Sequence, residues 1–279
     1  MPPARLGRYD EPMTTTATLR PVGNILREWR QRRRMSQLEL ALDAEISTRH
    51  LSFLETGRAR PSREMVLLLA ERLEVPLRER NALLLAAGYA PAYPENPLGE
   101  GALKAARQAV DLILTGHEPY PALAIDRHWT LVAANRAVAP LLVDAEGALL
   151  QPPVNVVRLS LHPRGLAPRI ENLAQWRAHL VARLRQQVEA TADPVLRDLL
   201  REASGYPAPP GGPSGPTFGG IAVPLRLRTG HGVLSFISAT TVFGSAVDVT
   251  LSELAIESFF PADPETAAAL RAQSSAASS

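Results

Sequence analysis

The chain has 279 residues, of which 46% are hydrophobic, which is enough for one large or two modest domains with buried cores. It contains no cysteine, which excludes disulfides, thiolate metal sites and a cysteine nucleophile. The formal net charge is only +2, but residues 1–90 hold 15 Arg against 11 Asp or Glu, whereas residues 91–279 hold 15 Lys or Arg against 17 Asp or Glu. An anionic partner is therefore expected to meet the N-terminal third of the chain.

Proline-rich and small-residue segments divide the chain into regions. Residues 1–20 lack periodicity and are interpreted as a flexible arm, and residues 91–100, which begin with three closely spaced prolines, as a linker. This leaves a first domain at 21–90 and a second at 101–271, with a disordered tail at 272–279. No apolar run approaches the ~18 residues of a membrane span, and the N-terminus has no apolar signal core, so we expect a cytoplasmic protein without a membrane partner.

Apolar spacing predicts five helices in the first domain. They are Val22–Arg34, Gln37–Ala44, Thr48–Glu55, a helix opened by Pro61-Ser62 and a helix opened by Pro76 that ends at Gly88. Ser36 and Glu39 form a capping box at the start of the second helix, which is expected to turn Leu38 and Leu42 inward. The second and third helices are short and joined by a tight turn, as in a helix-turn-helix, where the later helix enters the major groove of DNA.

The same residues carry a resemblance to a known family. Several spaced segments are similar to the lambda-repressor-like, or xenobiotic-response-element, helix-turn-helix family: Ser36–Ala41, Ile46–Ser47, Leu51–Arg58 and Pro61–Ser62. That family usually has glycine in the turn, where this chain has Glu45, at a backbone cost on the order of 1 kcal/mol. A five-helix bundle used only for protein contacts is the alternative interpretation.

The resemblance implies double-stranded DNA as a partner and assigns roles by position. Gln37 would contact the phosphate backbone, with a base edge as a further partner. Thr48 and Ser52 would reach base edges, and Arg58 would contact phosphate. Arg49 is the residue we expect to read sequence, because a guanidinium pairs bidentately with guanine, although a phosphate contact is the alternative. The two half-sites typical of such operators imply a homodimer.

The second domain mixes helical and strand periods. Strands are expected at Pro121–Arg127, Thr130–Ala134, Ile221–Leu227, Val233–Phe243 and near 253–260, and helices at Ala102–Thr115, from Asn135 to Leu142, Ile170–Glu189, Pro194–Ala203 and Pro264–Arg271. This order predicts a five-stranded antiparallel sheet with helices over one face, a PAS-like domain. The whole chain is therefore assigned to the α+β class.

A second resemblance covers this domain. The segments that carry it are Ala124–Trp129, Ala134–Asn135, Asn155–Pro163, Asn172–Arg177 and Glu257–Asp263, which are similar to the MmyB-like regulators. Membership implies a one-component transcription regulator whose PAS-like half holds an apolar, fatty-acid-like ligand. No cofactor is expected other than a bound fatty acid. A C-terminal domain that only contacts another protein is the alternative.

Candidate ligand anchors follow from helical spacing. Asn155, Arg158 and His162 stand three and four residues apart, so they are expected on one helical face, where Arg158 could pair with a carboxylate. Asn135 is a further candidate, and His162 has the simpler alternative of ending the helix before Pro163. We expect a cavity of roughly several hundred Å3 with aliphatic walls and one or two polar anchors.

The sequence gives no positive sign of catalysis. The six histidines lack helical metal-ligand spacing, and we find neither a nucleophile elbow nor a phosphate-binding glycine loop. An enzyme fused to a DNA-binding domain would need such a constellation. We therefore expect neither an enzyme nor a metal site.

Overall fold

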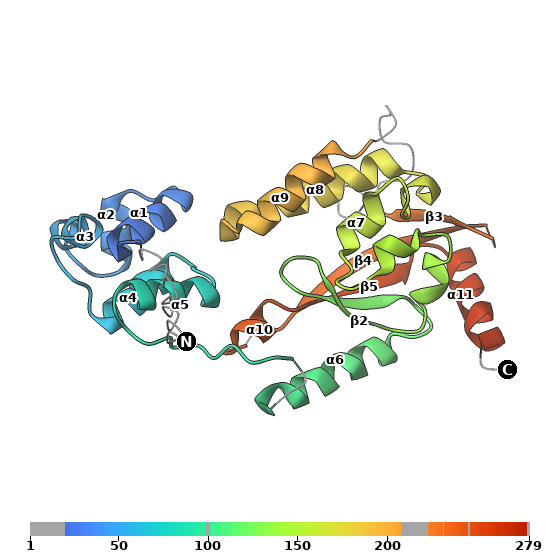
Figure 1. Cartoon of the computed structure of the whole chain (residues 1–279), viewed down its shortest axis with the longest axis horizontal. Coiled ribbons are helices and arrows are strands. Elements are labelled where there is room, and N and C mark those ends of the chain that lie inside the picture. Colours follow the sequence, from blue (N-terminus) through green and yellow to red (C-terminus); the bar gives the residue numbers. More distant parts are fainter. Residues whose placement is uncertain (1–19, 99–100, 208–222, 231, 245, 278–279) are drawn as a thin grey trace, which may run out of the picture. The chain divides into compact units, whose positions relative to one another are not determined.

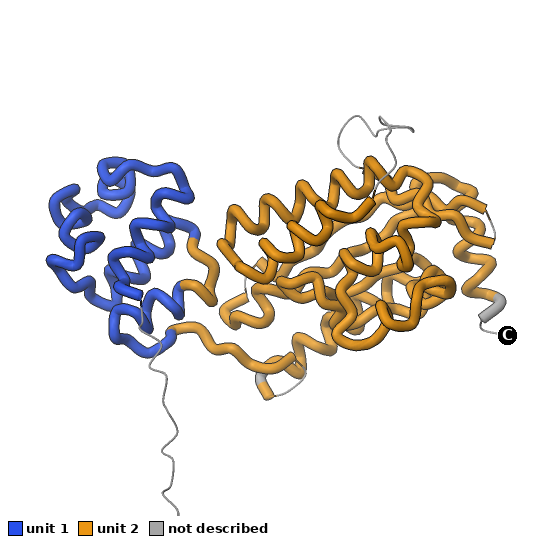
Figure 2. The backbone as a smooth tube through the Cα atoms, turned by 45° about the horizontal axis from the view of Figure 1, so that its top comes forward, with its two compact units in different colours: residues 1–74, 80–91 blue, residues 75–79, 92–279 orange. Residues whose placement is uncertain are grey.

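The chain forms two compact units. A computed structural model describes residues 20–98, 101–207, 223–230, 232–244 and 246–277. Unit 1 comprises residues 1–74 and 80–91, and unit 2 comprises residues 75–79 and 92–279 (Figure 2). The expected arm lies almost wholly outside the described residues. No helix in the described part of the chain combines the length and apolar character needed to cross a bilayer.

Residues 20–91 fold into five α-helices, as predicted (Figure 1). They are α1 (Val22–Arg32), α2 (Gln37–Asp43), α3 (Thr48–Glu55), α4 (Arg63–Arg72) and α5 (Leu77–Ala86). Helices α2, α3 and α4 begin after Ser36, Ser47 and Ser62, each of whose hydroxyls accepts a backbone N–H bond from the residue three positions on. The capping box is confirmed, because Glu39 accepts a bond from the Ser36 N–H at 2.6 Å, which lowers the pKa of Glu39.

The buried face of α2 differs from the prediction. Leu38 and Leu42 are 57% and 69% exposed, whereas Leu40, Ala41 and the C-cap residue Ala44 are buried. A helix of seven residues offers two overlapping apolar stripes that share Ala41, and periodicity over two turns does not decide between them. Packing against the neighbouring helices makes that choice.

The turn between α2 and α3 adopts the left-handed conformation at Glu45, whose φ is +55°. Glycine takes this conformation freely, whereas an L residue with a Cβ is strained by about 1–2 kcal/mol. The expected strain at this position is therefore present, and the helix-turn-helix geometry is kept despite the missing glycine.

Unit 2 is built on a five-stranded antiparallel sheet, as predicted, and the chain is α+β. The strands are β1 (Ala122–Ile125), β2 (Leu131–Ala134), β3 (Leu225–Thr229), β4 (Gly232–Val242) and β5 (Ala255–Pro261). Their order in the described residues is β2-β1-β5-β4-β3, so that β5, the last strand, lies between β1 and β4. The sheet therefore pairs β1, the first strand of unit 2, with β5, its last strand.

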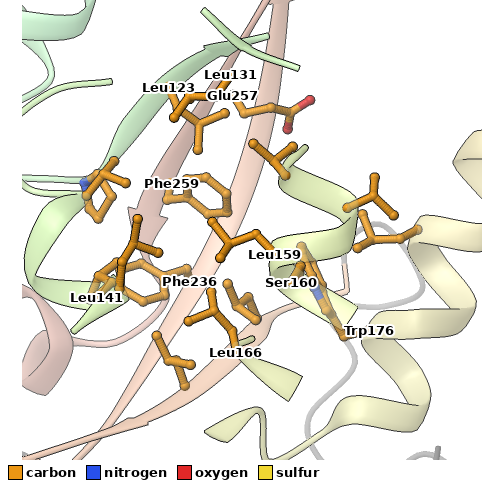
Figure 3. Close-up of a pocket in the computed structure, with 18 of the residues that line it drawn as sticks. Leu123, Leu131, Leu141, Leu159, Ser160, Leu166, Trp176, Phe236, Glu257 and Phe259 are labelled. Atoms are coloured by element: carbon orange, nitrogen blue, oxygen red, sulfur yellow. Dashed lines mark hydrogen bonds between the residues drawn. The ribbon is translucent and has the colours of Figure 1, made fainter. Parts of the chain in front are cut away.

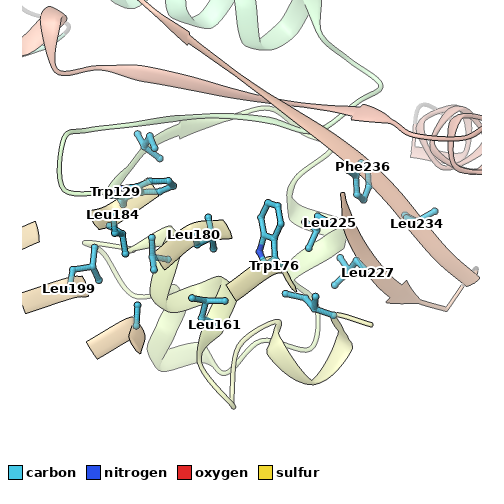
Figure 4. Packing of buried hydrophobic residues seen from close by; sticks show 14 of the residues in the cluster. Trp129, Leu161, Trp176, Leu180, Leu184, Leu199, Leu225, Leu227, Leu234 and Phe236 are labelled. Carbon is cyan, nitrogen blue, oxygen red and sulfur yellow. The ribbon is translucent and has the colours of Figure 1, made fainter. Parts of the chain in front are cut away.

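The helices of unit 2 pack on both faces of this sheet. They are α6 (Lys104–Gly116), α7 (Val156–Leu161), α8 (Leu173–Thr191), α9 (Pro194–Gly205), α10 (Val249–Ser252) and α11 (Pro264–Ala277), with 3-10 turns at Gly101–Leu103, Ala139–Leu142, Gly147–Leu150 and Ala167–Arg169. Ala122 and Ala124 of β1 pack in a cluster with α6, whereas Leu123 and Ile125 pack in the larger cluster with α7, α8 and α9. Figure 4 shows that larger cluster, with Leu161 of α7, Leu180 of α8 and Leu199 of α9 among its members. Because neighbouring strand residues point to opposite faces, the expectation that all helices cover one face is wrong.

Three segments of unit 2 differ from the prediction by more than a shift of a few residues at their ends. The helix expected after β2 is only a 3-10 turn that contains Pro140, a residue that removes a backbone donor. The last helix runs past Arg271 to Ala277 through alanines that favour helix, so the expectation of a disordered tail is wrong for residues 272–277. Residues 92–98 of the expected linker belong to unit 2, where Pro94 accepts a bond from the Val249 N–H at 2.9 Å.

Candidate functional site: a helix-turn-helix face and an apolar cavity

Helix α3 presents the polar face predicted for DNA. Thr48 and Arg49 are exposed and Ser52 is half-buried, whereas Leu51 and Leu54 are fully buried against the rest of unit 1. The polar side chains are therefore available on one side of the helix. Whether each of them contacts a base stays a prediction.

Phe53 places two arginines on the same surface. The guanidinium carbon of Arg49 lies 5.3 Å from the centre of the Phe53 ring, and that of Arg58 lies 5.9 Å from it. A cation at this distance from an exposed aromatic face gains about 0.5–1 kcal/mol. The ring thus restrains both arginines, one in α3 and one just beyond it.

A buried ion pair fixes α3 to α1. Arg30 donates from Nε to Glu55 Oε1 at 2.6 Å and from Nη2 to Glu55 Oε2 at 2.9 Å, and its Nη1 donates to the Met35 carbonyl at 2.8 Å. The bonds to Glu55 raise the pKa of Arg30. Gln37 donates to Glu55 Oε2 at 2.8 Å, so this predicted DNA contact also has a structural bond, which uses one of its two amide hydrogens.

Glycine at position 23 lets α1 and α3 approach closely. A Cβ on Gly23 would lie 2.3 Å from the Leu54 carbonyl oxygen, well inside contact distance. The orientation of α3 therefore depends on Gly23 of α1 and on the ion pair between Arg30 of α1 and Glu55 of α3.

The arginine run at the end of α1 has mixed roles. Arg30 is buried in its ion pair, and Arg33 donates at 2.8 Å to each of two carbonyls just beyond the end of α4. Arg32 and Arg34 are exposed. Two of the four arginines in this run therefore serve the fold, and only the exposed two suit a solvated helix end or a nucleic-acid patch.

Unit 2 contains an apolar cavity between the sheet and α7 and α8 (Figure 3). Side chains from both layers line it, among them Leu123, Leu131, Leu159, Trp176, Phe236 and Phe259. Its volume is about 100 Å3, smaller than the predicted several hundred. An apolar cavity of roughly 150 Å3 accepts a molecule the size of benzene, so a long hydrocarbon chain requires the lining side chains to move.

Three polar residues line the cavity. The uncharged one is Ser160 of α7, which accepts a bond from Trp176 Nε1 at 2.9 Å. The two charged ones are Arg183 of α8 and Glu257 of β5. Arg183 Nη2 donates to Glu257 Oε1 at 2.6 Å, and the guanidinium carbon lies 4.7 Å from the centre of the Trp129 ring. Trp129 itself is buried with a φ of +64°, a conformation unusual for a bulky residue.

The four predicted ligand anchors do not line this cavity. Asn155 caps α7, and its Nδ2 donates to the His128 carbonyl at 2.8 Å. Asn135 is buried, with its amide bonded to three backbone groups. These two side chains hold elements of the unit together.

Arg158 and His162 also point elsewhere. Arg158 donates to Glu202 of α9 at 2.9 Å on a half-exposed surface, a pairing that raises the pKa of Arg158. His162 is the C-cap of α7, in agreement with the alternative that it ends the helix before Pro163. Its Nδ1 accepts a bond from the Arg164 N–H. The three side chains do not converge on the cavity, because Asn155 caps the start of α7 whereas Arg158 contacts Glu202 and His162 contacts Tyr206 at the end of α9.

Sequence reasoning missed Arg183 and Glu257. One signal was present: Glu257 and Phe259 alternate with Ile256 and Ser258, so a carboxylate stands on the same strand face as an aromatic residue. A charge on such a face needs a partner or a ligand. Among the described residues, no group of three or more His, Asp or Glu side chains could hold a metal ion.

A helix-turn-helix unit joined to an α+β unit with an apolar cavity defines a class, the DNA-binding transcription regulators that carry a ligand-binding domain. Residues 26–80 match the helix-turn-helix family, and residues 106–272 match the MmyB-like transcription regulator ligand binding domain. The second match covers more than half of the chain, which therefore belongs to the MmyB-like transcription regulators. Both matched families are parts of regulators and not of enzymes.

Other comparisons add little. A search of curated proteins gives no match. One similar solved structure is that of an RNA-binding Light-Oxygen-Voltage receptor, with 15% identity and a TM-score of 0.23 over 91% of this chain. The alignment spans 63% of that receptor chain, and a TM-score this low supports no inference about fold or function.

Proposed function

We propose that this protein is a one-component regulator that binds duplex DNA as a homodimer through α3 and senses an apolar, fatty-acid-like molecule in the cavity of unit 2. The observation that carries the proposal is the presence of both family domains in one chain, the second with an almost wholly apolar cavity. A regulator of this kind needs no membrane partner and acts in the cytoplasm.

Reading of DNA sequence is assigned to Arg49. It is exposed on α3, it is held near Phe53, and a guanidinium can donate two bonds to one guanine. Arg58 shares the same aromatic ring but lies past the helix end, where phosphate is the expected partner. The two arginines therefore make a matched pair for an experiment.

The DNA experiment begins with selection of a binding site from random duplexes by the full-length protein. Arg49→Ala should then lose about 1–3 kcal/mol on the selected site and relax preference at one base pair. Arg58→Ala should weaken binding to selected and random duplexes alike and reduce the salt slope by about one. Equal effects of the two variants on both kinds of DNA would contradict base reading by Arg49.

The ligand experiment measures the melting temperature of full-length, delipidated protein in the presence of two series of probes. One series is saturated fatty acids and the other is the corresponding alcohols, each with chains of about six to fourteen carbon atoms. Ligand that binds only the native state raises the melting temperature with concentration. Leu123→Phe, which fills the cavity, should reduce the shift, and Leu112→Phe on an exposed face of α6 should not. No shift with either series would exclude an acyl-chain ligand and favour the protein-contact alternative.

A further inference from the structure

The only cation among the described residues that line the cavity already has a counter-ion. Arg183 contacts Glu257 through Nη2 to Oε1 at 2.6 Å and through Nη1 to Oε2 at 3.3 Å. The Glu257 side chain is 5% exposed and that of Arg183 is 23% exposed. The cavity wall therefore presents a neutral ion pair and not a free positive charge.

The neighbours of the pair complete this neutral network. Thr240 on β4 accepts a bond from Arg183 Nη2 at 3.0 Å and donates one to Glu257 Oε1 at 2.9 Å. His179, one turn before Arg183 on α8, adds no second cation at neutral pH, because burial, helped by the charge of Arg183, lowers the pKa of His179. The Trp129 ring carries no charge.

The donors of Arg183 are only partly used. A guanidinium has five N–H groups, and three of them make the described bonds to Glu257 and Thr240. The Nε–H and one Nη1–H have no partner among the described residues. A neutral oxygen on a ligand could accept from them without disturbing the ion pair.

An ionised carboxylate would meet a different situation. Bound beside Arg183, it would place two anions on one cation in an apolar environment, where like charges repel strongly. Displacing Glu257 instead would leave a buried carboxylate without a counter-ion, which is costly. An alcohol, ketone, ester, amide or un-ionised acid avoids both penalties.

We propose that Glu257 sets the head-group specificity of this cavity, so that it admits a hydrocarbon chain with an uncharged oxygen-bearing head group and discriminates against an ionised carboxylate. This inference rests on the proposed ligand-binding function. It assigns to Arg183 the role of hydrogen-bond donor to the ligand, and to Glu257 that of a fixed internal anion.

The test compares 1-decanol with decanoate on full-length, delipidated protein by calorimetry or tryptophan fluorescence, near pH 8, where a carboxylic acid in water is ionised. The wild type should bind decanol at least about tenfold more tightly than decanoate. Glu257→Gln removes the charge at nearly constant shape, so it should lower this preference by at least about tenfold. Glu202→Gln removes the acid of the Arg158 pair outside the cavity and should leave the preference unchanged.

If the Glu257 variant fails to fold, the wild-type ratio can still refute the inference. Equal or tighter binding of decanoate by the wild type would overturn the inference while leaving the proposed function intact. Binding of neither probe would instead overturn the proposed function, and this inference with it. Loss of the decanol preference in Glu202→Gln to the same degree as in Glu257→Gln would show that Glu257 has no specific role.

Discussion

Removing the charge of Glu55 should loosen α3 from α1. Its carboxylate is 1% exposed and accepts two bonds from Arg30, so Glu55→Gln leaves a guanidinium that is 10% exposed beside an uncharged amide. Removing one partner of a buried ion pair costs about 3–5 kcal/mol. Since small domains are stable by about 5–15 kcal/mol, this is a large fraction of the stability of unit 1.

The matched control is Glu28→Gln in α1. Glu28 also pairs with an arginine, Arg20, but both side chains are substantially exposed, and such surface pairs are worth about 0–1 kcal/mol. The double variant Arg30→Met with Glu55→Leu replaces the buried pair by apolar groups and should recover most of the loss, because hydrophobic replacements of buried pairs are often neutral.

Native-state hydrogen exchange measures these changes in each unit separately. A loss of 3 kcal/mol corresponds to exchange about 100-fold faster in α1 and α3, and peptides from α8 provide the internal reference. Glu55→Gln should also weaken DNA binding through displacement of α3. Exchange in α1 and α3 no faster for Glu55→Gln than for Glu28→Gln would refute the assignment of a structural role to this pair.

Three further predictions follow from single positions. Gly23→Ala should destabilise unit 1 by about 1–3 kcal/mol, because the new Cβ would meet the Leu54 carbonyl. The control Gly116→Ala in unit 2, where the new Cβ has no atom within 4 Å, should cause no such loss of stability, and hydrogen-exchange rates measure both effects. Glu45→Gly should stabilise unit 1 by up to about 1 kcal/mol, since relief of strain outweighs the added freedom of the unfolded chain; a lower melting temperature would contradict this. Burial lowers the pKa of His179 below its ordinary value of 6.5. The contribution of His179 to stability is therefore full above that pH, and it is lost as the pH falls, because the unfolded state takes up a proton more readily than the folded state. His179→Phe should therefore flatten the fall in melting temperature between about pH 7 and pH 5, and an unchanged pH profile would argue against it.

Local signals predicted the helices of unit 1 well. The capping interactions of Ser36 and Ser47 involve residues three positions apart, so the sequence alone contains both partners. The same locality explains why the ends of α3 agree with the prediction while the buried stripe of α2 does not. Burial of Leu40 in place of Leu38 depends on helices that are distant in sequence.

The polar groups of the cavity could not be found in the same way. The helical spacing of Arg158 to Asn155 predicts a shared face, but the partner of Arg158, Glu202, lies 44 residues further on. Arg183 and Glu257 are 74 residues apart and meet only because α8 packs over β5. Spacing predicts which residues share a helix face, and it contains no information about which other element covers that face.

The two buried arginine–glutamate pairs have similar geometry and different surroundings. In both, the carboxylate is more buried than the guanidinium, with side-chain exposures of 1% against 10% for Glu55 and Arg30 and 5% against 23% for Glu257 and Arg183. Each guanidinium uses three of its five N–H donors, Arg30 on Glu55 and a backbone carbonyl and Arg183 on Glu257 and Thr240. The surroundings differ, because Arg183 and Glu257 line the apolar cavity of unit 2, whereas Arg30 and Glu55 lie between α1 and α3. This difference in surroundings, and not the ion pair itself, is the basis for assigning the first pair to the fold of unit 1 and for proposing that the second takes part in ligand recognition.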